Sequence, residues 1–188
     1  MKKEHLNQIQ SYFDKLKNTL DNVDKEEVAK FVELLEEARA NKKQIFIFGN
    51  GGASTTAAHF ASDLNKPVDP NFPNRFKIIC LNDNIPTMLA YANDISFDDI
   101  FKEQLKNLVQ EGDLVIGMSG SGNSKNIVKA IEYANSVNAK TIGITGYDGG
   151  KLKKVSDYSV NANINDMQIS QDYHLILVHI AMQIIFEM

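Results

Sequence analysis

The chain has 188 residues, of which 43% are hydrophobic and 23% are charged, and its formal net charge is −4. This composition is typical of a globular protein with one sizeable core, and the acidic balance argues against nucleic acid as the main partner, because phosphate backbones require concentrated Lys and Arg. No run approaches the ~20 apolar residues of a membrane span, and the first ten residues lack the apolar core of a signal peptide. We therefore expect a cytoplasmic protein with no nucleic-acid or membrane partner.

Helical and strand patterns alternate along the chain. Helices are predicted from the spacing of apolar residues at 4–20, 25–40, 53–65, 84–92, 97–110, 123–137 and 168–187. Short apolar runs rich in β-formers lie at 44–49, 76–81, 113–118 and 141–145, with a weaker run at 157–163. The only cysteine, Cys80, falls within one of these runs, so no intrachain disulfide can form and the thiol is expected to be buried.

This alternation predicts the fold class. Strands that alternate with helices favour a parallel sheet covered on both faces, and continuously apolar runs are typical of strands buried on both sides. We therefore predict a three-layer α/β/α protein with a five-stranded parallel sheet, forming a single domain over residues 1–188. Residues 1–22 form an additional helix that is not needed to cover the sheet, and we expect it to pack on a partner subunit.

A loop rich in glycine and serine follows the predicted strand at 113–118. The stretch GMSGSGNSKN at 117–126 holds three serines, three glycines and two asparagines, more than a glycine turn with a helix cap requires. Because the loop leads into a helix, it combines serine hydroxyls with the free N–H groups of a helix N-terminus at the sheet edge where α/β proteins bind ligands. These groups suit a phosphate monoester. The predicted phosphate-binding residues are Ser119, Gly120, Ser121 and Ser124.

A second loop of this kind follows the strand at 44–49. In FGNGGAST at 48–55, residues Asn50, Gly51 and Gly52 indicate a tight turn that brings backbone N–H groups close to a ligand. The loop is neither a Walker A motif, because no Gly-Lys-Ser/Thr follows, nor a dinucleotide fingerprint, because the G-x-G-x-x-G spacing is absent. Two such loops predict a sugar phosphate held between them.

The histidines indicate a metal site or an acid–base pair. His59 and Asp63 are four residues apart on one helical face, which suits two metal ligands, although a surface ion pair is the simpler interpretation. Gln171 and His179 share a face of the last helix but lie ~12 Å apart along its axis. His179 sits in the apolar stretch LILVHIAMQII and would also fit a core histidine. His174 faces elsewhere and is interpreted as a structural or interface residue.

Taken together, these segments resemble a known family. GNGGASTTAAHFASDL at 49–64 and GMSGSGNSKN at 117–126 resemble the signature segments of sugar isomerase (SIS) domains, which have a flavodoxin-like fold. The histidine after GNGG and the C-terminal QDYHLILVH at 171–179 are most similar to the phosphoheptose isomerase branch. The similarity covers nearly the whole chain, including the N-terminal helix, YANDISFDDIF at 91–101 and TGYDGG at 145–150.

The resemblance implies a reaction and a set of site residues. The family converts sedoheptulose 7-phosphate to glycero-manno-heptose 7-phosphate, feeding lipopolysaccharide, capsule or nucleotide-sugar synthesis, and works as a homotetramer. A base removes the proton beside the carbonyl, and the enediolate is reprotonated at the neighbouring carbon. The resemblance assigns zinc to the positions of His59, Asp63, Gln171 and His179, proton transfer to Asp63 and His179, and substrate contacts to Asn93, Asp94 and Gln171. Zinc would act as the Lewis acid on the substrate oxygens.

The chain departs from the family in two places. The family has Glu where this chain has Asp63, which withdraws the carboxylate by roughly 1 Å, enough to damage a positioned proton transfer. The stretch before Gln171, which carries Thr and Arg in the family, is MQIS at 167–170 and has no cation. Two alternatives to the enzyme therefore stay open, namely a non-catalytic SIS module that binds a phosphosugar or a protein partner, and a structural oligomer with a vestigial pocket. The presence of both His59 and His179 favours the enzyme, because a binding module needs neither.

Overall fold

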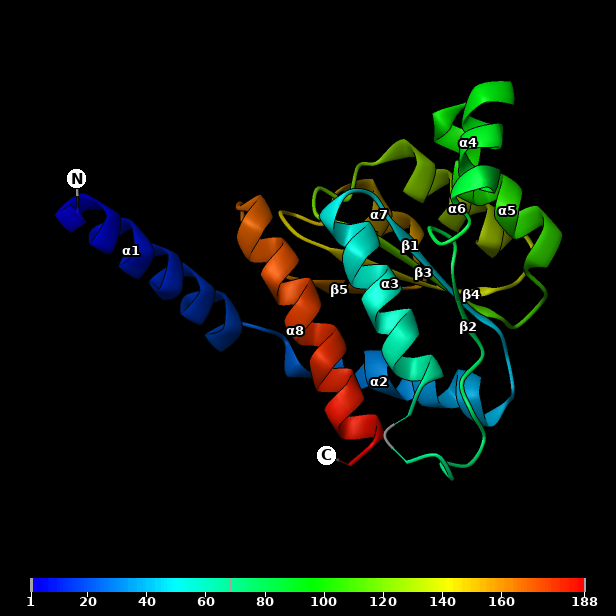
Figure 1. The fold of residues 1–188 in the computed structure, drawn as a ribbon, viewed down its shortest axis with the longest axis horizontal. Helices are drawn as coiled ribbons and strands as arrows, with labels where there is room; N and C mark the ends of the chain where they lie inside the picture. The colour runs from blue at the N-terminus through cyan, green and yellow to red at the C-terminus, as the bar shows by residue number, and fades with distance from the viewer. Residues whose placement is uncertain (1, 68, 188) are drawn as a thin grey trace.

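The computed structural model describes residues 2–67 and 69–187, which form a parallel sheet between two layers of helices (Figure 1). All pairs of neighbouring strands are parallel, and the strand order is β2-β1-β3-β4-β5. The strands are β1 (Ile45–Gly49), β2 (Ile78–Cys80), β3 (Leu114–Ser119), β4 (Lys140–Thr145) and β5 (Tyr158–Asn161). The predicted five-stranded parallel sheet is thus confirmed, and its order is that of flavodoxin-like folds.

Each face of the sheet carries its own hydrophobic core. Successive side chains of a strand point to opposite faces, so Ile45 and Ile47 of β1 belong to one core while Phe46 and Phe48 belong to the other. The first core packs against α2 (Lys25–Ala40), α3 (Gly52–Asn65) and α8 (Met167–Ile185). The second packs against α4 (Ile85–Asp94), α5 (Ile100–Leu108), α6 (Lys125–Ser136) and α7 (Gly150–Val155). No helix among the described residues is long and apolar enough to span a membrane.

Two elements differ from the prediction. The helix α7 was not predicted, because six residues are too few to display a helical period. The edge strand β2 covers only three of the six residues predicted at 76–81. The loop before it is held by Arg39, whose guanidinium lies 4.8 Å from the Phe72 ring centre and 5.6 Å from that of Phe76.

Cys80 is buried as expected, and burial raises the pKa of its thiol to about 11, so it is not a nucleophile at neutral pH.

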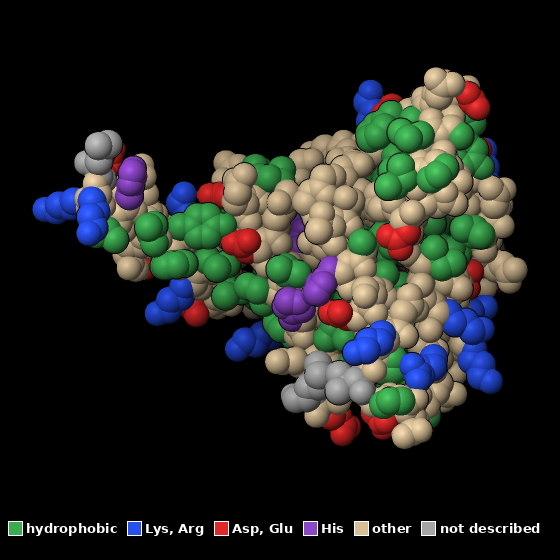
Figure 2. All heavy atoms as spheres, viewed as in Figure 1, with side chains coloured by type: hydrophobic (Ala, Val, Ile, Leu, Met, Phe, Trp, Pro, Cys, Tyr) green, Lys and Arg blue, Asp and Glu red, His purple; other side chains and the backbone are tan. Residues whose placement is uncertain are grey.

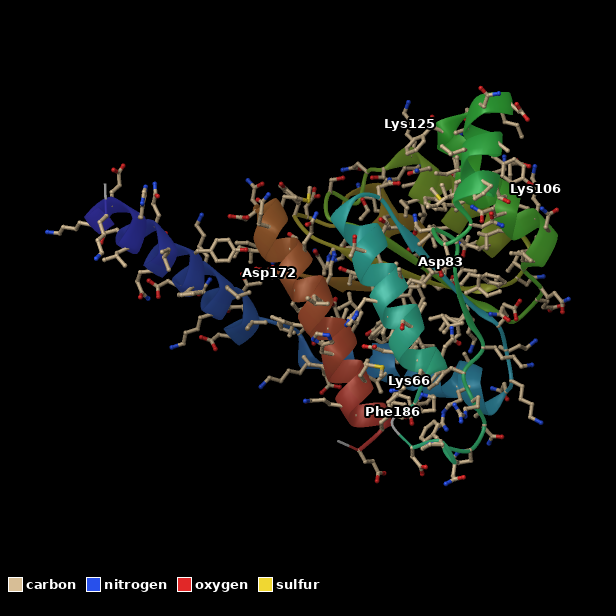
Figure 3. All side chains as sticks on the ribbon, viewed as in Figure 1. Lys66, Asp83, Lys106, Lys125, Asp172 and Phe186 are labelled. Atoms are coloured by element: carbon tan, nitrogen blue, oxygen red, sulfur yellow. The ribbon has the colours of Figure 1, made fainter. Side chains whose placement is uncertain are left out.

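The N-terminal helix α1 (Lys2–Asp21) projects from the body of the protein beside α8 (Figure 1). Two polar contacts tie it to α8: the Tyr12 hydroxyl donates to Asp172 at 2.6 Å, and Lys15 pairs with Asp166 at 3.4 Å (Figure 3 labels Asp172). The carboxylate of Asp172 raises the pKa of Tyr12 to about 12. Figure 2 shows hydrophobic side chains along the projecting part of α1. The exposed apolar residues there are Leu6, Ile9 and Phe13.

Candidate active site

Two strand-to-helix loops meet where the strand order reverses. β1 leads through Asn50 and Gly51 into α3, and its neighbour β3 leads through the serine loop, residues 120–124, into α6. α3 lies on one face of the sheet and α6 on the other. The region between the carboxyl ends of β1 and β3, here called the crevice, is therefore the place where open α/β sheets usually bind ligands. The structure thus brings the two predicted phosphate-binding loops to one place.

The serine loop is held in shape by its own hydrogen bonds. The buried Ser119 hydroxyl accepts from the Gly122 N–H at 3.1 Å and lies 3.2 Å from the Ser124 hydroxyl. The loop following β4 and the helix α7 brace it further, because Gly146 N–H donates to the Gly120 carbonyl and Leu152 N–H of α7 donates to the Gly122 carbonyl, both at 2.8 Å. The loop is therefore preorganised before any ligand arrives, and Ser119 acts at least partly as an internal support.

Both helices at the crevice begin without a side-chain cap. Gly51 precedes α3 and Ser124 precedes α6, and neither makes a capping hydrogen bond from its side chain. No cap side chain therefore takes up the first N–H groups of either helix, and the positive ends of two helix dipoles lie at the two loops. Ser121 and Ser124 are only half-buried and can add hydroxyl donors. This combination is suited to a phosphate or sulfate anion.

The N-terminal part of α8 lies against both loops. A Cβ atom placed on Gly52 would sit 2.5 Å from Gln171 Oε1, and one on Gly120 would sit 2.5 Å from the Met167 sulfur. A side chain at either position would displace the flexible end of Gln171 or Met167, so the two glycines leave room for these side chains of α8 beside the loops. The Gln171 amide, which is predicted to contact both substrate and metal, stands against the first residue of α3.

Two predicted substrate residues lie outside this arrangement in the single chain. Asn93 and Asp94 are exposed at the carboxyl end of α4, where the Asn93 amide donates to the Asp94 carboxylate at 2.8 Å. The following segment is fixed to α6 by the nearly buried Asp99, which accepts from Ser96 at 2.7 Å and pairs with Lys129 at 2.9 Å. The Ser96 and Lys129 hydrogen bonds lower the pKa of Asp99 to about 2.

Asn126 lies at the end of the serine stretch at 117–126 but was not among the predicted site residues. The side-chain amides of Asn50 and Asn126 donate to each other, at 2.9 and 3.0 Å, and so link the loop after β1 to the first turn of α6, next to the serine loop. Asn126 is 2% exposed. The sequence did contain one signal for this residue. Asn126 is a polar residue in the first turn of the predicted helix at 123–137, on the face that packs against the core.

The histidine cluster, formed by His59, Asp63 and His179, lies between α3 and α8. His59 is two helical turns beyond Gly52, and His179 is two turns beyond Gln171. His59 Nε2 is 3.0 Å from His179 Nε2 and 3.3 Å from Asp63 Oδ2. The side chains of His59 and Asp63 are 44% and 34% exposed, so the cluster faces solvent, and Figure 2 shows histidine side chains on this face. Packing of α3 on α8 thus brings together residues that are 120 positions apart.

These three side chains fit a metal ion. Their ligand atoms all lie within 4.8 Å of one another. Ligands about 2.0–2.2 Å from a tetrahedral zinc ion stand roughly 3.3 Å apart, close to the two distances measured from His59 Nε2. One Nε2 atom faces both a carboxylate and a second imidazole nitrogen, and a single N–H cannot donate well to both. The three side chains can therefore serve together as ligands of one metal ion.

The comparisons with known proteins agree with this geometry. A family model of the SIS domain matches residues 11–146. The phosphoheptose isomerase of Helicobacter pylori (strain 26695) is 35% identical, and the alignment covers 96% of this chain and 91% of that protein. The chain belongs to the phosphoheptose isomerase family. A probable phosphoheptose isomerase of Thermoplasma acidophilum is 33% identical, with 88% of this chain and 91% of that protein covered.

Solved structures of the family have the same fold. A phosphoheptose isomerase from Francisella tularensis superimposes with a TM-score of 0.90 at 27% identity, covering 98% of this chain and 99% of that one. The protein from Neisseria gonorrhoeae gives a TM-score of 0.88 at 26% identity. These matches confirm the predicted SIS fold, and membership of the phosphoheptose isomerase family makes the chain an isomerase.

His174 of α8 is fully buried, as a structural residue would be. Neither ring nitrogen has a hydrogen-bond partner among the described residues. Burial lowers the pKa of His174 from 6.5 to about 4, opposed in part by the nearby Thr145 backbone. The imidazole is therefore neutral in the folded protein at neutral pH.

This shift predicts a pH-dependent stability. Between about pH 6.5 and pH 4 the unfolded chain binds a proton on His174 that the folded chain does not, so the free energy of unfolding decreases as the pH falls through this window. The slope from this one group is about 1.4 kcal/mol per pH unit. Urea denaturation at several pH values should give a shallower slope for His174→Gln. His5→Gln, on exposed α1, should keep the wild-type slope, and equal slopes for all three proteins would contradict the assignment.

Proposed function

We propose that this isomerase interconverts sedoheptulose 7-phosphate and D-glycero-D-manno-heptose 7-phosphate, supplying heptose for lipopolysaccharide, capsule or a nucleotide sugar. The observation that supports this substrate is the spacing of the two parts of the site along α3. His59 follows Gly52 by seven residues, a helical rise of about 10 Å. A phosphate at the crevice would thus be separated from the histidine cluster by roughly the length of an extended seven-carbon sugar.

The phosphate would bind in the crevice between β1 and β3. The N–H groups of Gly51 and Gly52 and the hydroxyls of Ser121 and Ser124 are the expected donors. Hydrogen bonds to a charged group contribute ~1.5–3 kcal/mol each. Gln171 stands beside this crevice and would contact the sugar next to the phosphate.

His59, Asp63 and His179 would hold a zinc ion. Gln171, which the resemblance to the family adds as a fourth ligand, stands against Gly52 two helical turns from His179, so in the single chain it does not join these three side chains. When bound, zinc supplies Lewis-acid polarisation of the carbonyl and hydroxyl oxygens of the sugar. The donor set of two imidazoles and one carboxylate suits this metal. The neutral forms of both imidazoles are needed for binding, so the metal affinity is expected to fall as the pH decreases.

Proton transfer is assigned to Asp63 and His179. A carboxylate or imidazole close to the sugar carbons can take the proton beside the carbonyl and return a proton to the neighbouring carbon. Asp63 lies one helical turn from His59 and reaches its ring, so the shorter side chain still arrives at the cluster. This contact supports an active enzyme despite the departure from the family's Glu.

The reaction can be tested with a panel of five- to seven-carbon ketose phosphates followed by NMR. We expect turnover of sedoheptulose 7-phosphate and incorporation of deuterium from D2O at the carbon next to the carbonyl. Deuterium exchange reports enolisation even where net conversion is small. Exchange into a shorter ketose phosphate and none into the heptulose would overturn the proposed substrate, and no exchange into any of them would overturn the proposed chemistry.

We further propose that the chain assembles into a homotetramer through α1. The predicted apolar stripe of α1 divides in the structure: Leu20 packs against the core, whereas Leu6, Ile9 and Phe13 are 56%, 51% and 58% exposed. Three large apolar side chains on one projecting helix indicate a surface that another subunit covers. Assembly would also limit access of water to the exposed histidine cluster, which favours proton transfer.

The assembly proposal makes a direct prediction. Replacing both Ile9 and Phe13 by Asp places charges in the proposed interface, and burying an unpaired charge is strongly unfavourable. Light scattering at micromolar concentration is expected to give a tetramer mass for the wild type and a lower mass for the double variant. A control in which Asn7 and Gln10 are replaced by Asp adds the same charge to α1 outside the stripe. A monomeric wild type, or an unchanged mass for the double variant, would exclude this interface.

A further inference from the structure

The two anion-binding loops are joined by a reciprocal amide pair. Asn50 Nδ2 donates to Asn126 Oδ1 at 2.9 Å, and Asn126 Nδ2 donates to Asn50 Oδ1 at 3.0 Å. Asn50 follows β1, and Asn126 is the second residue of α6, directly after the serine loop. The pair therefore connects the end of β1 to the start of α6 at the point where the strand order reverses.

Both side chains are fixed by this contact. Asn126 is 2% exposed, and its Oδ1 also accepts the Ile127 N–H at 3.0 Å. An amide buried this deeply is costly unless its groups are bonded, and leaving one donor or acceptor unpaired costs about 1–3 kcal/mol. The mutual bonds also use one donor and the acceptor oxygen of the Asn50 side chain, which is thereby bound to α6. The predicted ligand contact of the turn at Asn50 would come from its backbone N–H groups.

The pair supports the serine loop on the side where other supports are lacking. Toward β4 the loop is braced by two backbone hydrogen bonds, from Gly146 to Gly120 and from Leu152 to Gly122. Toward β1 the paired strands end at Gly49 and Met118. Beyond that point, among residues 2–67 and 69–187, the hydrogen bonds that join Asn50 and Gly51 to the segment 120–126 are those of the asparagine pair.

We propose that Asn50 and Asn126 act as a spacer that fixes the separation of the two anion-binding loops, and that both are positioning residues for the sugar phosphate. This inference rests on the phosphate site proposed above. Donors from two loops bind one anion well only if the separation of the loops matches the size of the anion. When the loops are already held at that separation, no free energy is lost in arranging the donors on binding. Loss of the pair should weaken anion binding although neither amide touches the anion.

The variant N126D tests the spacer through its pH dependence. At about pH 7.5 the introduced carboxylate can still accept from Asn50 Nδ2 but has no proton for Asn50 Oδ1, so two oxygens face each other and one of the two bonds of the pair is lost. Sulfate is the probe, because it stays dianionic over the range used. We expect N126D to bind sulfate at least ~10-fold more weakly than the wild type at this pH, which corresponds to one lost hydrogen bond.

Lowering the pH should rescue the variant. Once the pH is low enough to protonate the introduced carboxyl group, it can again donate to Asn50 Oδ1. The ratio of variant to wild-type sulfate affinity, measured by calorimetry at each pH, should therefore return toward one. In turnover assays KM should rise more than kcat falls. Should N126D not fold, N50D places the same carboxyl group on the opposite side of the pair and is expected to show the same rescue.

A matched control lies at the other end of the same helix. Asn135 donates to the Val155 carbonyl at 2.7 Å and accepts from the Thr141 hydroxyl at 2.8 Å. N135D should lower stability without changing sulfate affinity at either pH. Wild-type sulfate affinity in N126D, or a loss that does not recover at low pH, would overturn the spacer. Failure to isomerise sedoheptulose 7-phosphate would instead overturn the proposed substrate, because the sulfate measurement needs no turnover.

Discussion

Replacing Asp63 by Asn is expected to lower turnover at least ~100-fold, the lower range for a positioned acid–base group. The amide keeps the size of the side chain but can neither take a proton nor supply a charged ligand. His179→Gln should cost a similar factor. The double variant should be little worse than either single one, because both residues serve one proton-transfer path. Steady-state kinetics on the four proteins gives this comparison, with Asp21→Asn on exposed α1 as the control.

Metal content separates the two roles proposed for Asp63. If the carboxylate is a ligand, Asp63→Asn should also lose bound zinc, measured by elemental analysis after dialysis. If it acts only as the base, zinc should remain while turnover is lost. An active wild type whose Asp63→Asn variant is equally fast would refute both roles.

The variant Asp63→Glu examines the departure from the family. In an active enzyme adapted to the shorter side chain, the extra methylene displaces the carboxylate by roughly 1 Å and should lower turnover. In a chain that has lost the reaction but kept the ligand, Asp63→Glu should instead raise turnover. Asp63→Asn would then leave sugar-phosphate binding nearly unchanged. Turnover and binding measured on the same variants thus discriminate an enzyme from a non-catalytic SIS module.

Gly122→Ala is expected to be the most destabilising single substitution in the serine loop. Gly122 has φ +66°, and a Cβ atom there would lie 2.0 Å from the Gly149 carbonyl oxygen. Because the obstacle is backbone, one of the two loops must move. Backbone strain and overpacking each cost about 1–3 kcal/mol, and the displaced loop should also bind sulfate more weakly.

Gly51→Ala isolates the backbone contribution. Gly51 also has a positive φ, +53°, but no atom lies within 4 Å of the position that its Cβ would take. Its substitution should cost only the strain, so urea denaturation should show a smaller loss of stability than for Gly122→Ala, by about 1–3 kcal/mol. Equal losses for the two variants would show that the collision with Gly149 is relieved without cost.

Much of the fold was determined by residues close together in the sequence. The apolar runs around Ile45 and Leu114 predicted buried parallel strands, and the glycines and serines after each strand predicted the two anion-binding loops. These features depend on side-chain periodicity and local backbone preferences, which short segments express by themselves. The same reasoning missed α7 because six residues are too few to show a period.

The site, by contrast, depended on contacts between distant segments. The sequence placed His59 and Asp63 on one face, but only the packing of α3 against α8 brought His179 Nε2 to 3.0 Å from His59 Nε2. It likewise decided that Asn50 bonds Asn126 across 76 positions. Such pairs have no periodic signature, since they arise where two helices or loops meet in space. Local sequence determined the elements and their faces, and tertiary packing decided which faces met.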